Sequence, residues 1–383
     1  MALHFSKEEF SKRKQDVLKS MRDQNLDALL MFRQESMYWL TGYDTFGYVF
    51  FQTLVLDKKG NIILLTRAPD LRQAQNTSNI ENIKIWVDKD GINPTDDLKK
   101  ILNDLNLKNK NIGIEYEAYG MTGRNALRLN KSLENYCKVE DQSELITKLR
   151  VIKSKEELVY VRKAAELADR ALDEAWKHAK AGVNEAKILA EMQKTVLEGG
   201  GDYPANEYII GSGSNALLCR YQAEKRDLST KDQLSLEWAG TFKHYHSAMF
   251  RTIPIGKTDA KHIKMHEACV EALENCEKKL VAGNKIGEVF DIHANTFDKL
   301  GFNKARMNAC GYSLGATFSP NWMDWPMLFT GNPYIIKPGN VFFMHMILMD
   351  SESQLAMNLG ETYLVTENGN ERLGKQKLDL VTL

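Results

Sequence analysis

The residues best suited to chemistry gather in one stretch, residues 234–256. It holds one carboxylate, Glu237, two histidines, His244 and His246, and one arginine, Arg251, among aromatic and small residues. The flanks are apolar enough to be buried, and charged side chains are rarely buried without a partner or a purpose. The stretch therefore predicts a group of reactive side chains held inside the protein.

The same stretch predicts two strands joined by a short turn near Gly240. Because side chains alternate along a strand, His244 and His246 would point to one face of the sheet. That spacing suits either a metal pair or a single catalytic or orienting histidine. No carboxylate partner is evident for the pair, so we expect no metal there.

A third candidate histidine, His345, lies in the apolar strand expected over residues 341–349. A charge would be costly in such a strand. A neutral histidine packed in the core is one interpretation, and a catalytic histidine is the other.

The composition excludes several classes of partner. The chain of 383 residues has 51 basic and 51 acidic residues, and this balance argues against nucleic acid and anionic membranes as partners. No apolar run approaches the roughly 20 residues that span a bilayer, and the N-terminus lacks the apolar segment of a secretion signal. The five cysteines are scattered without a C-x-x-C pair, which is typical of reduced thiols in a cytoplasmic protein.

Apolar periodicity divides the chain into two parts. Residues 1–150 alternate strands with helices, which is typical of an α/β domain. Residues 151–383 predict two helices, a hairpin, two more helices and then strands, with a capping box from Ser154 to Glu157 starting the first of these helices. The expected helices span residues 6–24, 36–41, 96–107, 122–133, 184–197, 260–280 and 286–300, besides the one that begins after Ser154. The expected strands span residues 27–32, 49–57, 61–66, 83–88, 111–115, 207–210, 311–318, 341–349, 355–359 and 361–366.

The second part resembles the metallopeptidase family of methionine aminopeptidase, prolidase and creatinase, which has the pita-bread fold. The motifs that carry the resemblance follow the family's order and lie at residues 149–158, 211–216, 250–252, 337–343 and 361–369. The first part resembles the smaller creatinase-type N-terminal domain. The resemblance implies an α/β N-terminal domain over 1–150, an α+β pita-bread catalytic domain over 151–383, and a homodimer.

The departures from that family are informative. Its peptidases bind two metal ions through two Asp, one His and two Glu, and the motifs align these positions with Glu237, Ala248, Tyr312, His345 and Gly360. One carboxylate remains, and Ala and Gly offer no side-chain ligand. The resemblance therefore implies the fold but argues against a metal cofactor and against peptidase activity.

Longer motifs resemble the ectoine hydrolase family within this group. They lie at residues 65–74, 236–240, 244–246, 311–318, 322–327, 343–350 and 359–361. That family opens the cyclic amidine of ectoine, and usually of hydroxyectoine, to an acetylated diaminobutyrate. The resemblance implies these two small molecules as substrates and a deacetylase as a downstream partner.

The residue types fit that chemistry. Ectoine joins an amidinium to a carboxylate, so its site needs an anion, a cation and flat apolar walls. A carboxylate can activate water or attack directly, and a histidine or tyrosine can move the proton. The catalytic candidates are Glu237, His345, Tyr312, Glu361 and His246. The substrate-binding candidates are Arg220, His244, Trp322, Trp325, Phe318 and Asp324.

Each candidate has a structural alternative. Glu237 could serve an ion pair, Arg220 could be a surface residue that stands where creatinase has its catalytic histidine, and the aromatic residues could belong to the core. Arg251 could be purely structural. Candidates to cap a neighbouring subunit's site are Tyr38, Trp39, Tyr43, Phe46, Tyr48 and Arg67. A metal-dependent dipeptidase with unusual ligands, or a non-catalytic peptide-binding module, stays open as an alternative function.

Overall fold

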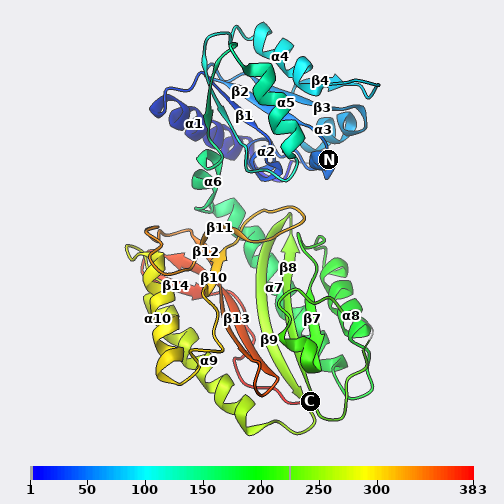
Figure 1. Ribbon diagram of the computed structural model, residues 1–383, viewed down its shortest axis with the longest axis vertical. Helices are drawn as coiled ribbons and strands as arrows, with labels where there is room; N and C mark the ends of the chain where they lie inside the picture. Colours follow the sequence, from blue (N-terminus) through cyan, green and yellow to red (C-terminus); the bar gives the residue numbers. More distant parts are fainter. Residues whose placement is uncertain (1–2, 224–225) are drawn as a thin grey trace. The chain divides into compact units, whose positions relative to one another are not determined.

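The computed structural model describes residues 3–223 and 226–383, and its internal contacts divide the chain into two compact units, Met1–Arg150 and Val151–Leu383 (Figure 1). Each unit has its own sheet. No helix in the described part of the chain is long and apolar enough to cross a membrane.

The first unit is a mixed six-stranded sheet with helices on both faces, in the strand order β4-β3-β2-β1-β5-β6. One apolar cluster joins the sheet to α4 and α5, and another joins it to α1, α2 and α6. Its strands are β1 (Ala28–Met31), β2 (Thr53–Asp57), β3 (Ile62–Arg67), β4 (Asn82–Trp86), β5 (Asn111–Ile114) and β6 (Lys138–Asp141). Its helices are α1 (Lys7–Asp23), α2 (Gln34–Thr41), α3 (Leu71–Thr77), α4 (Pro94–Asp104), α5 (Gly123–Leu133) and α6 (Leu145–Arg150), with short 3₁₀ turns η1 (Gly47–Val49) and η2 (Ala68–Asp70).

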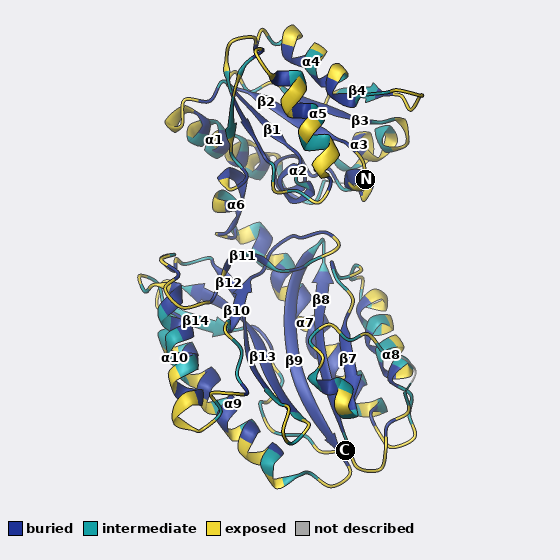
Figure 2. Cartoon of the chain, viewed as in Figure 1, coloured by how far each residue is buried: buried dark blue, intermediate teal, exposed yellow. Residues whose placement is uncertain are grey.

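The second unit is an antiparallel sheet in the order β11-β10-β12-β13-β9-β8-β7, with β14 paired to β13. Its strands are β7 (Ile209–Ser212), β8 (Asp232–Phe242), β9 (Tyr245–Ile255), β10 (Gly311–Ser313), β11 (Asp324–Met327), β12 (Val341–Asp350), β13 (Leu355–Thr366) and β14 (Gly369–Arg372). Its helices are α7 (Lys155–His178), α8 (Glu185–Glu198), α9 (Ala260–Lys279) and α10 (Ile286–Lys299), with the turn η3 (Gly213–Leu217). The long strands are buried, whereas α8, α9 and α10 each have an exposed side (Figure 2).

The α/β first unit and the α+β second unit confirm the predicted fold class. The capping box is also confirmed: Ser154 accepts a hydrogen bond from the Glu157 amide, and the Glu157 carboxylate accepts one from the Ser154 amide. These bonds satisfy amides that the first turn of α7 would otherwise leave unpaired. They fix the start of the helix that packs along β8 and β9.

The predicted turn near Gly240 is wrong. Gly240 lies inside β8, and the hairpin turns at Lys243 and His244, both with positive φ. A Cβ on Gly240 would overlap the carbonyl oxygen of Ala164 in α7. The glycine is therefore needed for close approach between helix and strand, a role that glycine can fill as readily as a turn.

Other boundaries also differ from the predictions. Residues 355–366 form one strand, β13, where two were expected, because residues 355–364 pair without interruption with β12. The strand expected over 311–318 ends at Ser313, and the strand expected from residue 49 begins at Thr53 after a 3₁₀ turn. Elements α3, β6, α6, β11 and β14 were not predicted.

Replacing Gly240 with Ala should lower the free energy of unfolding by about 3 kcal/mol, because the added methyl must push α7 away from β8. Urea denaturation measures this loss. The matched control is Gly123→Ala, at the start of α5, where an added Cβ meets nothing within 4 Å. That change should be neutral or slightly stabilising, and equal stability of the two variants would disprove the close approach.

Candidate active site

Glu237 lies on the face of the large sheet that points away from helix α7. Its neighbour Trp238 points to the helix and donates a hydrogen bond from Nε1 to the carbonyl of Ala168, at 3.0 Å. Because side chains alternate along β8, Glu237 must point the other way. It is buried, with 8% of the residue's surface exposed.

Strand register brings His345 to the same face. Glu237 pairs with Phe250 across β8 and β9, Phe250 pairs with Gly360 across β9 and β13, and Gly360 pairs with His345 across β13 and β12. Directly paired residues share a face. These four residues therefore form one row across four neighbouring strands.

Tyr312 completes the group from β10. Its register partner on β12 is Phe343, two residues before His345 and on the same face. The Tyr312 hydroxyl donates a hydrogen bond to Glu237 Oε1 at 3.2 Å, and Trp322 Nε1 donates one to the Tyr312 hydroxyl at 2.8 Å. The centre of the His345 ring lies 5.7 Å from that of Tyr312. The structure thus brings together four of the predicted site residues: Glu237, Tyr312, Trp322 and His345.

Burial gives Glu237 an unusual proton affinity. It raises the pKa of the carboxyl to about 7, against the opposing effects of the Tyr312 hydrogen bond and the nearby Arg220 cation. A carboxyl with such a pKa exchanges protons readily near neutral pH, as a general acid or base must. The geometry therefore favours proton transfer at Glu237.

The other two titratable groups stay neutral near pH 7. Burial, together with the Arg220 cation, lowers the pKa of His345 to about 4. Burial raises the pKa of Tyr312 well above its ordinary range, as does the adjacent Glu237. His345 can therefore accept a proton and Tyr312 can donate a hydrogen bond, without either adding charge to the site.

The residues present do not fit the two metal ions that the peptidases of this fold bind. Of the five aligned positions, Glu237 alone has a carboxylate. A Cβ on Gly360 would lie 2.7 Å from ring atoms of Phe343 and 2.9 Å from Cβ of Phe250. The Phe343 ring and Cβ of Phe250 therefore fill the space that a fifth ligand would need.

No cluster of three potential metal ligands includes Glu237 in the described part of the chain. The one such cluster there joins Glu174 and His178 of α7 to Glu191 of α8. All three are partly exposed, and Lys177 and Lys194 pair with its carboxylates. It lies apart from the row of Glu237.

The two histidines of the hairpin are separated, which corrects the prediction that they share a face. His244 lies in the turn and stacks on Phe318, with ring centres 4.2 Å apart. His246 is fully buried in β9, where its Nε2 accepts a hydrogen bond from the Ala205 amide at 2.9 Å. The centre of the His246 ring lies 6.2 Å from that of Trp322.

The remaining substrate-binding candidates differ in their relation to the group of Glu237, Tyr312 and His345. Arg220 is exposed, and its charge acts on Glu237, Tyr312 and His345. Trp325 packs its ring edge-on against Tyr334, away from this group, with ring centres 5.1 Å apart. Asp324 is buried at the start of β11 and accepts a hydrogen bond from the Trp325 amide.

Glu361 does not join the site. It follows Gly360 on β13 and so points to the opposite face, where it forms a fully buried ion pair with Arg251. Glu361 was a candidate because it is next to Gly360, an aligned ligand position, in the sequence. Adjacent residues of a strand point to opposite faces, however, so Glu361 lies away from the site. Glu361 and Arg251 hold β13 to β9.

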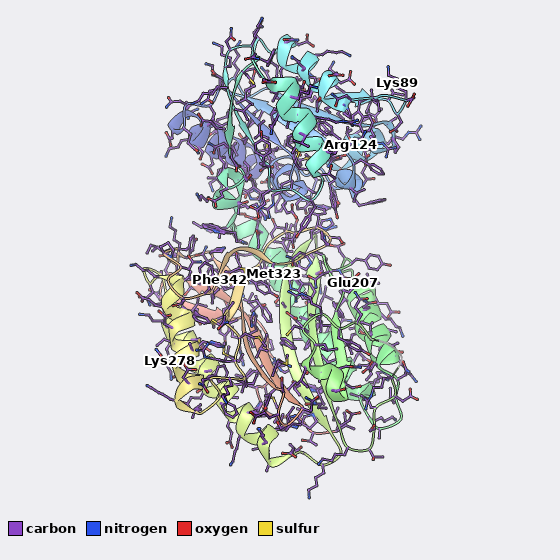
Figure 3. All side chains as sticks on the ribbon, in the orientation of Figure 1. Lys89, Arg124, Glu207, Lys278, Met323 and Phe342 are labelled. Atoms are coloured by element: carbon purple, nitrogen blue, oxygen red, sulfur yellow. The ribbon has the colours of Figure 1, made fainter. Side chains whose placement is uncertain are left out.

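The sequence reasoning missed the importance of Phe250 and Phe343. Both lie on the face of Glu237 and fill the space around Gly360. Strand alternation is the signal that could have found them, since each lies two residues from an aligned ligand position, Ala248 or His345. Figure 3 shows how densely side chains fill this unit, with Phe342 of β12 and Met323 of the loop before β11 labelled.

The six residues of the first unit that were expected to cap a neighbouring subunit's site differ in exposure. Tyr38, Trp39 and Tyr43 are buried, and so is most of Tyr48, whereas Phe46 is 79% exposed. The Arg67 guanidinium lies over the ring of Phe50, 4.0 Å from its centre. Four of the six candidates are therefore buried within their own unit.

Comparison with known proteins agrees with this architecture. The model of "Metallopeptidase family M24" matches residues 159–367, and that of "Creatinase/Prolidase N-terminal domain" matches residues 13–152. An ectoine hydrolase of Halomonas elongata is 26% identical, covering 97% of each chain, and a Xaa-Pro dipeptidase of Pyrococcus horikoshii is 22% identical, covering 95% of this chain and 97% of its own. The prolidase structure from Thermococcus sibiricus superposes with a TM-score of 0.88 at 20% identity, covering 98% of this chain and 99% of its own.

Replacing Glu237 with Gln should stabilise the fold at alkaline pH. The folded carboxyl has a pKa of about 7 against an ordinary value of 4.5. Between these pH values the folded protein binds a proton that the unfolded chain has lost, so wild-type stability falls as pH rises through this window. The gain in Tm of Glu237→Gln should be at least about 3 °C larger at pH 8 than at pH 5.

Scanning calorimetry at the two pH values measures this difference. The control is Glu207→Gln, at an exposed carboxylate ahead of β7, whose effect should not change with pH. A pH-independent gain for Glu237→Gln would show that the buried carboxyl titrates normally.

Proposed function

The chain belongs to metallopeptidase family M24, and we propose that within this family it is a metal-independent hydrolase that opens the cyclic amidine ring of ectoine, and of hydroxyectoine, to an acetylated diaminobutyrate. The observation that carries the proposal is that Glu237 is the one carboxylate among the five aligned ligand positions, hydrogen-bonded by Tyr312 and raised by burial to a pKa of about 7. The relative of this chain named ectoine hydrolase supports the choice of substrate.

The reaction needs no Lewis acid because an amidinium carbon is already electrophilic. In the water route, the Glu237 carboxylate takes a proton from water while the water oxygen bonds to that carbon. The ring C–N bond then breaks, and the departing nitrogen receives both protons of the water, leaving an amide and an ammonium. In the alternative route, Glu237 attacks the carbon itself and the ring C–N bond breaks. Water then attacks the acyl-type intermediate and releases the Glu237 carboxylate; the water oxygen stays in the amide and its two protons end on the departing nitrogen.

Neighbouring groups have complementary tasks in this proposal. Tyr312 donates to Oε1 of Glu237 and so orients the carboxylate. His345 passes a proton to the departing nitrogen. Arg220 pairs with the substrate carboxylate, because a guanidinium can bond both oxygens at once. The indole of Trp322, anchored through Tyr312, forms part of an apolar wall.

The cellular location, the oligomeric state and the partner belong to the same proposal. We propose a cytoplasmic homodimer whose product is passed to a deacetylase. The competing function is that of the relatives named Xaa-Pro dipeptidases, which would need metal ligands beyond Glu237 and His345.

Incubation with ectoine should produce ring opening that proton NMR can follow. Activity should persist after dialysis against a chelator, and metal analysis should find no stoichiometric divalent ion. No turnover of either ectoine or hydroxyectoine would reject the proposal. Chelator-sensitive cleavage of Xaa-Pro dipeptides would establish the competing function instead.

The Glu237→Gln variant should lose about 10³-fold or more in kcat while remaining folded, since it can no longer move a proton or attack. The exposed-site variant Glu207→Gln should keep wild-type activity. Near wild-type turnover by Glu237→Gln would show that the site is misassigned.

The Tyr312→Phe variant should shift the acidic limb of the kcat/KM profile to higher pH. The Tyr312 hydrogen bond lowers the pKa of Glu237, so its loss raises that pKa and leaves less carboxylate at a given pH. The measured quantity is the position of the limb, which reports the free enzyme. A limb that stays in place or moves to lower pH would show that another group controls it.

A further inference from the structure

His246 lies on the same face of the large sheet as Glu237, but some way along it. Glu237 pairs with Phe250 of β9, and His246 comes four residues before Phe250 on that strand. Four residues of a strand span about 13 Å and return to the same face. Any effect of His246 on the carboxylate must therefore pass through other residues.

The hydrogen bonds of the His246 ring define its tautomer. The ring is fully buried, and the Ala205 amide, which can only donate, lies 2.9 Å from Nε2. Nε2 therefore carries the lone pair, and the one proton of the neutral imidazole is on Nδ1. Nδ1 faces two oxygens, the Thr317 hydroxyl at 3.2 Å and the Gly315 carbonyl at 3.5 Å. Burial lowers the pKa of His246 to about 3, so the ring stays neutral.

The Thr317 hydroxyl connects His246 to Trp322. Because this hydroxyl accepts from Nδ1, its own proton is donated to the Trp322 carbonyl, 3.5 Å away. The Trp322 amide donates in turn to Oδ1 of Asn206 at 3.0 Å. Asn206 follows Ala205, the partner of Nε2. Two connected segments thus hold the main chain of Trp322, and His246 bonds to both.

The main chain fixes the same segment to the hairpin of β8 and β9. The His246 amide donates to the Gly315 carbonyl at 3.2 Å, and the Thr317 amide donates to the His244 carbonyl at 3.1 Å. The chain that leads to Trp322 is therefore tied to the strand that carries His246.

The indole of Trp322 gives a direction to the hydrogen bonds at the site. An indole N–H can only donate, so the 2.8 Å bond between Nε1 and the Tyr312 hydroxyl runs from Trp322 to Tyr312. The single proton of that hydroxyl is then directed to Oε1 of Glu237, at 3.2 Å. A hydroxyl that accepts one hydrogen bond is a stronger donor in the next. The chain of donors therefore ends on the carboxylate.

We propose that His246 is a positioning residue: its neutral ring, protonated on Nδ1, holds Trp322 where the indole keeps the Tyr312 proton directed at Glu237. The inference rests on the proposed hydrolysis, in which Glu237 reacts. It assigns no proton transfer to His246 itself, in contrast to the catalytic role expected from the sequence.

Substrate-free protein labelled with ¹⁵N-histidine and ¹⁵N-tryptophan gives the first readout. The His246 signals, assigned by their loss in His246→Leu, should show the proton on Nδ1. The indole signal of Trp322, assigned by its loss in Trp322→Phe, should move or split in His246→Leu, because the indole is no longer held against Tyr312. The chain has eight histidines and six tryptophans, so both spectra can be assigned.

Three further variants separate positioning from general destabilisation. His246→Gln keeps one donor and one acceptor and should restore the wild-type indole signal. Thr317→Val keeps the side-chain size, removes the shared hydroxyl and should move the signal as His246→Leu does. The control is His262→Leu, which removes another buried histidine, bonded to Oε1 of Gln233 at 2.9 Å. It should lower stability and leave the Trp322 signal in place.

Kinetics give a second readout. With ectoine as the probe, His246→Leu and Thr317→Val should each lower kcat about 10-fold or more, with a smaller change in KM, because a misplaced catalytic group slows the reaction steeply. His246→Gln should recover most of the loss. His262→Leu should keep wild-type kcat.

A His246 ring protonated on Nε2 would overturn the inference. So would a Trp322 signal that stays in place in both His246→Leu and Thr317→Val, or one that moves equally in His262→Leu. Because the NMR measurement uses no substrate, its outcome stays readable even if ectoine is not turned over. A failure of the proposed function is thus distinguishable from a failure of this inference.

Discussion

A buried carboxylate on a sheet face, with one hydrogen bond from a tyrosine, is the constraint on which the candidate site depends. Glu237 must be accessible enough to meet a substrate yet buried enough to keep its pKa near 7. The close contact of α7 with β8 at Gly240 fixes which face of the strand is covered by helices. The opposite face is left for Glu237, His345 and Tyr312.

The same sheet explains why the chemistry can differ from that of the peptidases while the fold does not. The row that runs from Glu237 through Phe250 and Gly360 to His345 is set by backbone pairing, which is independent of what the side chains can bind. Side chains on this row can therefore change from metal ligands to apolar rings without moving a strand. Fold similarity to prolidases is thus compatible with a different reaction.

Much of this arrangement could be predicted from the sequence. The capping box at Ser154 and the apolar periodicity located the long helices, and the motifs aligned Glu237, Tyr312 and His345 with one site. The turn was misplaced because a glycine inside a strand has the same local signal as a glycine in a turn, and only the position of Ala164 distinguishes them. Glu361 was misjudged because adjacency in sequence means opposite faces in a strand.

The packing around Gly360 has a consequence for the history of such a protein. A glutamate there would collide with the ring of Phe343 and with Cβ of Phe250, so adding that ligand alone would harm the fold before any ion could bind. Several substitutions would have to accompany it, including a smaller residue in place of Phe343. The packing of Phe343 and Phe250 thus closes the single-substitution routes by which position 360 could gain a carboxylate ligand.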